Sequence, residues 1–321
     1  MADTEPIPDG QVADAVLGNW VDRYAPAALR PFLRLSRADR PIGTWLLLLP
    51  CWWAVALATL EKGTFVGFDA WVVIGCAIGA WLMRGAGCTW NDITDRKIDA
   101  SVARTASRPL PSGQVSLRGA ILWMGLQSLL AFAILVTFPP VAIALGIGSL
   151  ALIAIYPFAK RFTWWPQAFL GLAFNWGALL AFSAVTGDWP GAPALLLYAG
   201  GIAWTLFYDT IYAHQDTEDD ALIGVKSTAR LFGDATHIWL RWFLIAAVLY
   251  LCAALVAALA DGSDVLTLTI ALCGVWVFGW HLAWQLRTLD TEKPQVCLRL
   301  FRSNRDAGLI PVLFLAVAAF L

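Results

Sequence analysis

Two clusters of acidic residues have the spacing of side chains that share a helix face. In the first cluster, Asn91, Asp95 and Asp99 recur every four residues, and Asp92 lies beside them. Carboxylates stacked in this way repel one another, so another group must offset their charge. Magnesium suits that role because it binds one or two carboxylates together with substrate phosphates. The first cluster is therefore a candidate metal site.

The second cluster lies between Asp209 and Asp220. If this segment is helical, Asp209, Asp216 and Asp220 fall near one face. Basic residues accompany both clusters: Arg96, Lys97, Arg104 and Arg108 follow the first, and Lys226 and Arg230 follow the second. Carboxylates could hold metal ions while the cations contact phosphoryl oxygens. Together, the two clusters predict a site for a diphosphate.

The composition indicates that a membrane bundle positions both clusters. Hydrophobic residues make up 59% of the 321 residues and charged residues only 14%. Soluble domains have about 45–50% and about 25%, respectively. The net charge of −1 gives no indication of a nucleic-acid partner. The six cysteines form no CxxC pair, so neither a zinc site nor a disulfide framework is expected.

Apolar runs long enough to cross a bilayer, roughly 20 residues each, predict an all-α integral membrane protein. Nine such runs can be read from the chain, at 42–60, 70–90, 117–136, 139–158, 165–185, 192–213, 237–260, 264–284 and 307–321. The last run is short. We expect a cytoplasmic N-terminal segment over 1–40 and one nine-helix membrane domain over 41–321.

The positive charges alternate with the predicted spans. Basic residues concentrate before the first span and after spans two, four, six and eight, whereas the other connections contain only Lys62. Such a bias places the basic segments in the cytoplasm, with Leu321 on the opposite side. The acidic clusters follow spans two and six, which suggests two pseudo-repeated four-helix halves and a ninth helix. Both clusters then lie at the cytoplasmic edge of the membrane.

The motifs resemble those of the UbiA superfamily of membrane prenyltransferases, and more closely its 4-hydroxybenzoate polyprenyltransferase branch. The resemblance covers about residues 30–320 and keeps the order of the motifs. The matching blocks are 37–43, 84–88, 91–99, 104–113, 156–163, 208–220 and 224–233. The paired blocks 91–99 and 208–220 are highly specific to the family.

The resemblance implies a fold of nine helices around a central cavity. It also implies an Mg²⁺-dependent transfer of a polyprenyl chain from its diphosphate to 4-hydroxybenzoate, at the ring carbon next to the hydroxyl group, in ubiquinone biosynthesis. Metal and diphosphate ligands would be Asn91, Asp92, Asp95, Asp99, Asp216 and Asp220. Candidate phosphate contacts are Lys97, Arg104, Lys160, Arg161 and Lys226. The expected location is the cell's inner membrane.

Several roles stay open in the sequence. Asp209, or another carboxylate of the second motif, could accept the ring proton or polarise the phenol. Arg37 and Arg40 could bind the acceptor's carboxylate or serve only as positive-inside anchors. Asn175 is expected to bond a neighbouring helix rather than substrate.

Other functions remain as alternatives. A naphthoate, homogentisate or porphyrin-type ring could be the acceptor instead. From a different class of protein, a membrane transporter would also have intramembrane acids and paired halves. A transporter predicts charges near the bilayer midplane, however, and these acids gather at one edge.

Overall fold

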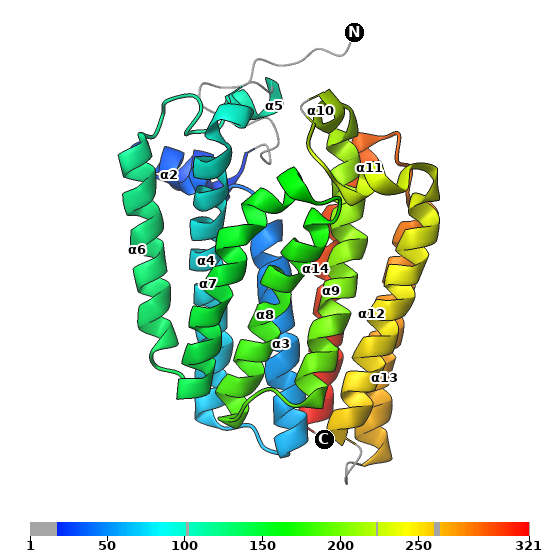
Figure 1. The fold of residues 1–321 in the computed structure, drawn as a ribbon. Coiled ribbons are helices and arrows are strands. Elements are labelled where there is room, and N and C mark those ends of the chain that lie inside the picture. Colours follow the sequence, from blue (N-terminus) through cyan, green and yellow to red (C-terminus); the bar gives the residue numbers. More distant parts are fainter. Residues whose placement is uncertain (1–17, 101–102, 223, 260–263, 321) are drawn as a thin grey trace. The chain divides into compact units, whose positions relative to one another are not determined.

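A computed structural model describes residues 18–100, 103–222, 224–259 and 264–320. The side chains of residues 97, 98, 103, 104, 218 and 219 lie outside that description. All regular structure within these ranges is helical (Figure 1). The chain divides into two compact units, 1–44 with 78–134 and 45–77 with 135–321. Each unit is described by itself below.

The first unit contains the N-terminal helices and the part of the chain that carries the first acidic motif. Its helices are α1 (Trp20–Tyr24), α2 (Arg30–Leu35), α5 (Ala103–Ala106) and α6 (Leu117–Leu135). The long helix α4 (Gly67–Asp99) contributes its residues from Ile78 onward. A small apolar core of Leu35, Val115 and Ala120 packs against the rings of Phe32 and Trp123. This core fixes the segment before α3 next to the start of α6.

The second unit contains most of the long helices. They are α3 (Ile42–Lys62), α7 (Pro140–Phe162), α8 (Pro166–Thr186), α9 (Ala192–Ala213), α12 (Thr236–Leu259), α13 (Val265–Thr288) and α14 (Pro294–Ala319). Between α9 and α12 come four short elements: η1 (His214–Asp216), α10 (Thr217–Leu222), α11 (Thr228–Phe232) and η2 (Gly233–Ala235). Neighbours in sequence pack together from α7 to α9 and from α12 to α14, and α9 also packs against α12 and α14.

Proline and glycine mark several helix ends as the sequence predicts. Pro140 and Pro166 occupy the first turns of α7 and α8, where a missing backbone N–H costs nothing. Gly187 ends α8 with a left-handed φ of 79°, a conformation that glycine adopts without steric cost. These residues place the connections 136–139, 163–165 and 187–191 between apolar runs.

Eight of the predicted spans are confirmed as helices long and apolar enough to cross a membrane, counting only the described residues. The ninth run, 307–321, lies within α14, which begins much earlier, at Pro294, and has 26 residues. The N-terminal half of α14 carries Arg299, Arg302 and Arg305. A count of nine spans therefore stays a prediction.

Polar side chains join the helices of the second unit inside its apolar core. Asn175 on α8 donates to the hydroxyl of Thr205 on α9 at 2.8 Å, as the sequence predicts. The indole of Trp204 donates to Asn304 on α14, and Asn304 also pairs with Gln285 on α13. Such bonds stabilise helix association in an environment without water. All six cysteines are free thiols in the described part of the chain.

Candidate functional site

The first acidic motif ends helix α4. The helix continues through Asp99, as the spacing of the motif requires. Asp92, Asp95 and Asp99 are buried, with 0%, 1% and 7% of their surfaces exposed, and Asn91 is half-buried. Three buried carboxylates on one helix need compensating cations or protons, because an isolated buried charge is strongly unfavourable.

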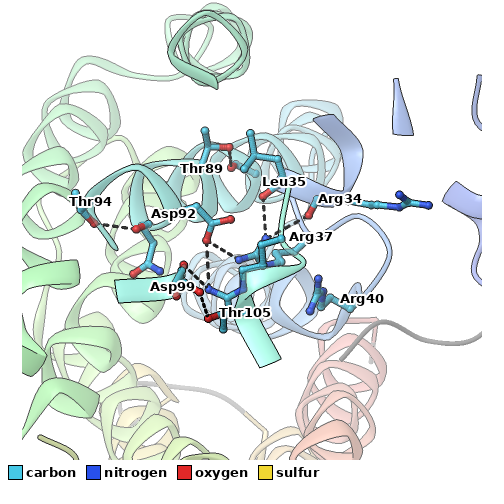
Figure 2. A network of polar contacts seen from close by, with 12 residues as sticks. Arg34, Leu35, Arg37, Arg40, Thr89, Asp92, Thr94, Asp99 and Thr105 are labelled. Carbon is cyan, nitrogen blue, oxygen red and sulfur yellow. Dashed lines mark hydrogen bonds and ion pairs between the residues drawn. The ribbon is translucent and has the colours of Figure 1, made fainter. Parts of the chain in front are cut away.

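Arg37 supplies the shortest of these compensating contacts. Its Nη2 atom lies 2.6 Å from Oδ1 of Asp92, and both side chains are almost fully buried (Figure 2). The Nη1 atom donates to the backbone carbonyls of Arg34 and Leu35 at 3.3 and 3.5 Å. The guanidinium is thus held from two sides.

The backbone at Arg37 is in the left-handed region, with a φ of 58°. It is the only residue other than glycine with a positive φ in the described part of the chain. This conformation is unfavourable for a residue with a Cβ atom. The cost is tolerated where surrounding contacts define the geometry, and here the turn directs the Arg37 side chain at Asp92.

Arg108 makes the second set of contacts, from the loop that follows α5. Its Nη1 atom lies 2.9 Å from Oδ2 of Asp99 and 3.6 Å from Oδ1 of Asp92 (Figure 2). The hydroxyl of Thr105 donates to the backbone carbonyl of Asp99 at 2.8 Å, which ties the same loop to the end of α4. One guanidinium nitrogen therefore bridges two carboxylates of the motif.

Burial sets the ionisation of the acids outside the spans. Burial raises the pKa of Asp99, which the nearby Arg108 opposes and Asp92 and Asp95 reinforce. Burial also raises the pKa of Asp39 to about 6, against the opposing charge of Arg37. Burial, the largest single effect, would lower the pKa of Arg37, but the charge and hydrogen bond of Asp92, together with Cys88 and Asp39, outweigh it and hold that pKa above its usual value.

The chemistry of the first motif fits a divalent cation. Oδ2 of Asp92 is buried and accepts no hydrogen bond from the described residues, although Oδ1 of the same carboxylate faces Arg37. Within the described ranges, no three His, Cys, Asp or Glu side chains come close enough together to hold an ion by themselves. Magnesium does not need such a set, since it binds through one or two carboxylates, phosphates and water.

The second acidic motif lies in the second unit and is less buried. Asp209 is on α9, Asp216 is in η1 and Asp220 is on α10, and all three are half-buried. The segment is helical from α9 through α10, but a 3₁₀ turn at His214–Asp216 interrupts the α-helical geometry, so that the three acids share one face stays a prediction. Their alignment therefore depends on the turn. The family resemblance also implies that the two motifs face each other, and this stays a prediction.

Basic residues of the second unit gather where the loop after α10 meets the end of α7. The backbone N–H of Lys226 donates to the carbonyl of Lys160 at 3.1 Å. The Nζ atom of Lys226 lies 3.4 Å from the carbonyl oxygen of Phe162 and 6.0 Å from the centre of the Trp164 ring. Arg230 also lies over Trp164, at 5.4 Å. Two of the predicted phosphate contacts, Lys160 and Lys226, are thereby brought together.

The remaining predicted residues have varied surroundings. Arg161 is exposed and lies over the ring of Phe158. Arg40 is half-buried, with its Nε atom 3.2 Å from Asp39. The side chains of Lys97 and Arg104 lie outside the described residues. His214 contacts the hydroxyl of Thr236 at 3.1 Å.

Two features of the site were not predicted from the sequence. The sequence places Arg108 near the motif but not in contact with both Asp92 and Asp99. It also gives no sign of the left-handed backbone at Arg37, because glycine and asparagine, which signal that conformation, are absent at this position. Only the proximity of a basic run to an acidic helix end could have suggested the Arg108 pairing.

Comparisons with known proteins place the chain among prenyltransferases. The UbiA prenyltransferase family model matches residues 47–305. The chain is 48% identical over 286 residues to the mitochondrial 4-hydroxybenzoate polyprenyltransferase of Bos taurus, covering 89% of this chain and 74% of the relative. It is 45% identical over 306 residues to the Arabidopsis thaliana protein of the same name, covering 94% and 72%.

Solved structures share the fold. A UbiA homolog from Aeropyrum pernix K1 superposes with a TM-score of 0.69 at 26% identity, covering 86% of this chain and 98% of that one. A UbiA homolog from Archaeoglobus fulgidus, solved bound to GPP and Mg²⁺, gives a TM-score of 0.65 at 20% identity, covering 90% and 98%. At 20% identity, the similarity to the Archaeoglobus fulgidus structure is evidence for the fold alone.

Proposed function

Because the chain belongs to the UbiA prenyltransferase family, we propose that it is a 4-hydroxybenzoate polyprenyltransferase of ubiquinone biosynthesis. It transfers a polyprenyl chain from polyprenyl diphosphate to the carbon ortho to the hydroxyl of 4-hydroxybenzoate. The observation that carries the proposal is the identity of 45–48% to proteins of this name over most of the chain. The buried carboxylates of α4 agree with it.

The two motifs bind the diphosphate in this proposal. Mg²⁺, held by these carboxylates, would neutralise the negative charge that develops on the leaving diphosphate. Its ligands are Asn91, Asp92, Asp95 and Asp99 of the first motif and Asp216 and Asp220 of the second. Phosphoryl oxygens contact Lys97, Arg104, Lys160, Arg161 and Lys226. The contact between the Lys226 loop and the Lys160 carbonyl supports a shared role for these two cations.

The acceptor half of the site rests on fewer observations. The carboxylate of 4-hydroxybenzoate requires a cation. We assign Arg40 to it because Arg40 is half-buried and contacts Asp39 through Nε, whereas Arg37 is buried and held by Asp92 and two backbone carbonyls. Asp209 accepts the proton that the ring loses, as a half-buried acid at the end of α9. The apolar bundle keeps water away from the allylic cation until the ring attacks.

For the location, we propose the cell's inner membrane, with both motifs on the cytoplasmic side and a single membrane domain over 41–321. The alternation of basic segments along the chain supports this orientation. The relatives named above are mitochondrial proteins.

The direct test is an assay of membranes containing the protein with Mg²⁺, 4-hydroxybenzoate and a long-chain prenyl diphosphate. The wild type should form the prenylated acid. Asp92→Asn and Asp216→Asn should each lower the rate by at least about 100-fold, since each removes a charge that stabilises the leaving group. Asp234→Asn, which alters an exposed acid outside both motifs, is the matched control and should keep the wild-type rate.

Two outcomes would contradict the proposal. One is well-folded wild-type protein that forms no product from 4-hydroxybenzoate. The other is full activity in both motif variants. Parallel reactions with a naphthoate and with homogentisate test the acceptor, because a faster reaction with either would replace 4-hydroxybenzoate as the substrate.

A further inference from the structure

The cations around the first motif differ in how firmly they are held. Arg37 donates to two backbone carbonyls and to Asp92, and its backbone conformation directs the side chain inward. Arg108 contacts the motif through Nη1, while its Nε atom is buried and makes no hydrogen bond. A buried donor without an acceptor is unfavourable. The contacts of Arg108 are therefore incompletely satisfied.

The carboxylate of Asp92, which both arginines contact, also has unsatisfied hydrogen-bonding capacity. Asp92 is 0% exposed, yet among the described residues only its Oδ1 atom has partners, and Oδ2 accepts no hydrogen bond there. Arg37 and Arg108 both lie against the Oδ1 atom of Asp92, at 2.6 and 3.6 Å. A second cation at Oδ2 would complete this carboxylate. A cation there would also lie close to the positive charge of Arg108, which is 3.6 Å from Oδ1.

We propose that Arg108 is an exchangeable counter-ion of the first motif and that a divalent cation displaces it, while Arg37 stays in place and positions Asp92. Like charges at short distance repel, so Arg108 and the ion compete for Asp92 and Asp99. Arg37 cannot move away from Asp92 without breaking its hydrogen bonds to the carbonyls of Arg34 and Leu35 and changing its left-handed backbone conformation. This inference rests on the proposed function only in taking the first motif as a metal site.

The competition predicts opposite effects on stability and on metal binding. Arg108→Gln should lower the unfolding temperature of the metal-free protein, because Asp99 loses its ion pair. The same variant should bind Mn²⁺ or Mg²⁺ about tenfold more tightly, the size of effect expected when one nearby positive charge is removed. Arg37→Gln should lower both the unfolding temperature and the affinity for the metal, because Asp92 is then no longer held in position.

The experiment uses the full-length protein in detergent without prenyl substrate. Metal affinity is measured by Mn²⁺ electron paramagnetic resonance with Mg²⁺ competition, and stability by thermal unfolding with and without metal. Arg96→Gln is the matched control, since it removes the same charge from an exposed position on α4. A rise in affinity that is larger in Arg108→Gln than in Arg96→Gln supports displacement. Equal effects, or weaker binding in Arg108→Gln, would overturn it.

If Arg108→Gln does not fold, the wild type can still decide the question. Phenylglyoxal modifies accessible guanidinium groups, and mass spectrometry of peptides reports each arginine. Mg²⁺ should increase modification of Arg108 and leave Arg37 unmodified. Unchanged or lower modification of Arg108 would contradict the proposal. The prenyltransfer assay tests the proposed function separately. An active enzyme in which Arg108 shows no metal-dependent difference would refute the inference alone. An inactive enzyme in which Arg108 does show that difference would refute the function alone.

Discussion

Asp39 is a buried acid whose charge depends on pH near neutrality. It is 1% exposed, and burial raises its pKa to about 6 from 3.8. The charges of Arg37 and Arg34 oppose this shift, and Asp22 adds to it. Because the folded protein holds this proton more tightly than the unfolded chain, the contribution of Asp39 to stability falls as the pH rises from about 4 to 6.

The expected consequence is that Asp39→Asn stabilises the protein more at pH 7.5 than at pH 4.5. The shift corresponds to about 3 kcal/mol at most, taking about 1.4 kcal/mol per pKa unit. Thermal unfolding of both proteins across this pH range measures the difference, and the infrared band of a protonated carboxyl should disappear in the wild type with a midpoint near pH 6. A difference in unfolding temperature that does not vary with pH would contradict the assignment.

At the scale of elements, α8 and α9 approach closely at Gly201. A Cβ atom at this position would overlap the amide oxygen of Asn175 and lie 2.6 Å from its Cγ atom. Asn175 has little freedom to move, since it donates to the carbonyl of Gly171 and to Thr205. The small residue on α9 therefore sets the distance between these two helices.

Gly201→Ala should accordingly destabilise the protein by about 1–3 kcal/mol, the usual cost of adding a methyl group to a packed interior. The control is Gly148→Ala on α7, where the added Cβ atom would lie 3.8 Å from the Trp176 ring, in ordinary contact. Denaturation in detergent compares the two variants. Equal stability of Gly201→Ala and Gly148→Ala would show that the helices can separate at this point.

At the scale of the whole molecule, the number of spans decides where residue 321 lies. Helix α14 has 26 residues, which corresponds to about 39 Å and is enough to cross a bilayer. Its apolar part after Asp306 is shorter, about 20 Å. We expect α14 to cross with its arginines at the cytoplasmic surface, where long side chains can reach water.

A fusion at Leu321 tests this topology. Nine spans place that residue opposite the cytoplasmic N-terminal segment, so fused alkaline phosphatase should be active and fused green fluorescent protein dark. The reverse pair of results would mean eight spans. A fusion after Lys160, which the charge bias puts in the cytoplasm, serves as the internal reference.

Much of the fold can be predicted from the sequence because a membrane helix is defined by its own residues. Length and apolarity locate α3 and α6 to α9 within a few residues. The start of α14 at Pro294 was missed because its first turns are charged. The 3₁₀ turn at His214 was missed because it breaks no pattern of residue types.

The candidate site also has a part that can be predicted from the sequence and a part that cannot. Types and spacing identify Asp92, Asp95 and Asp99, since a helix fixes their relative positions. Arg37 pairs with Asp92 and Arg108 pairs with Asp99. Both arginines lie in irregular segments, and the paths of these segments determine the contacts. Such contacts are not encoded in any local periodicity, so only the structure reveals them.

The pairing of Arg37 with Asp92 also has a consequence for how the chain is made. The two residues are 55 positions apart, and the arginine precedes the acid. During synthesis, the cation has left the ribosome before the buried carboxylate emerges at the end of α4. Asp99 follows the reverse order but waits only nine residues for Arg108. The counter-charges of Asp92 and Asp99 therefore both come from the part of the chain that precedes α7, and neither pairing uses a residue from α7 onward.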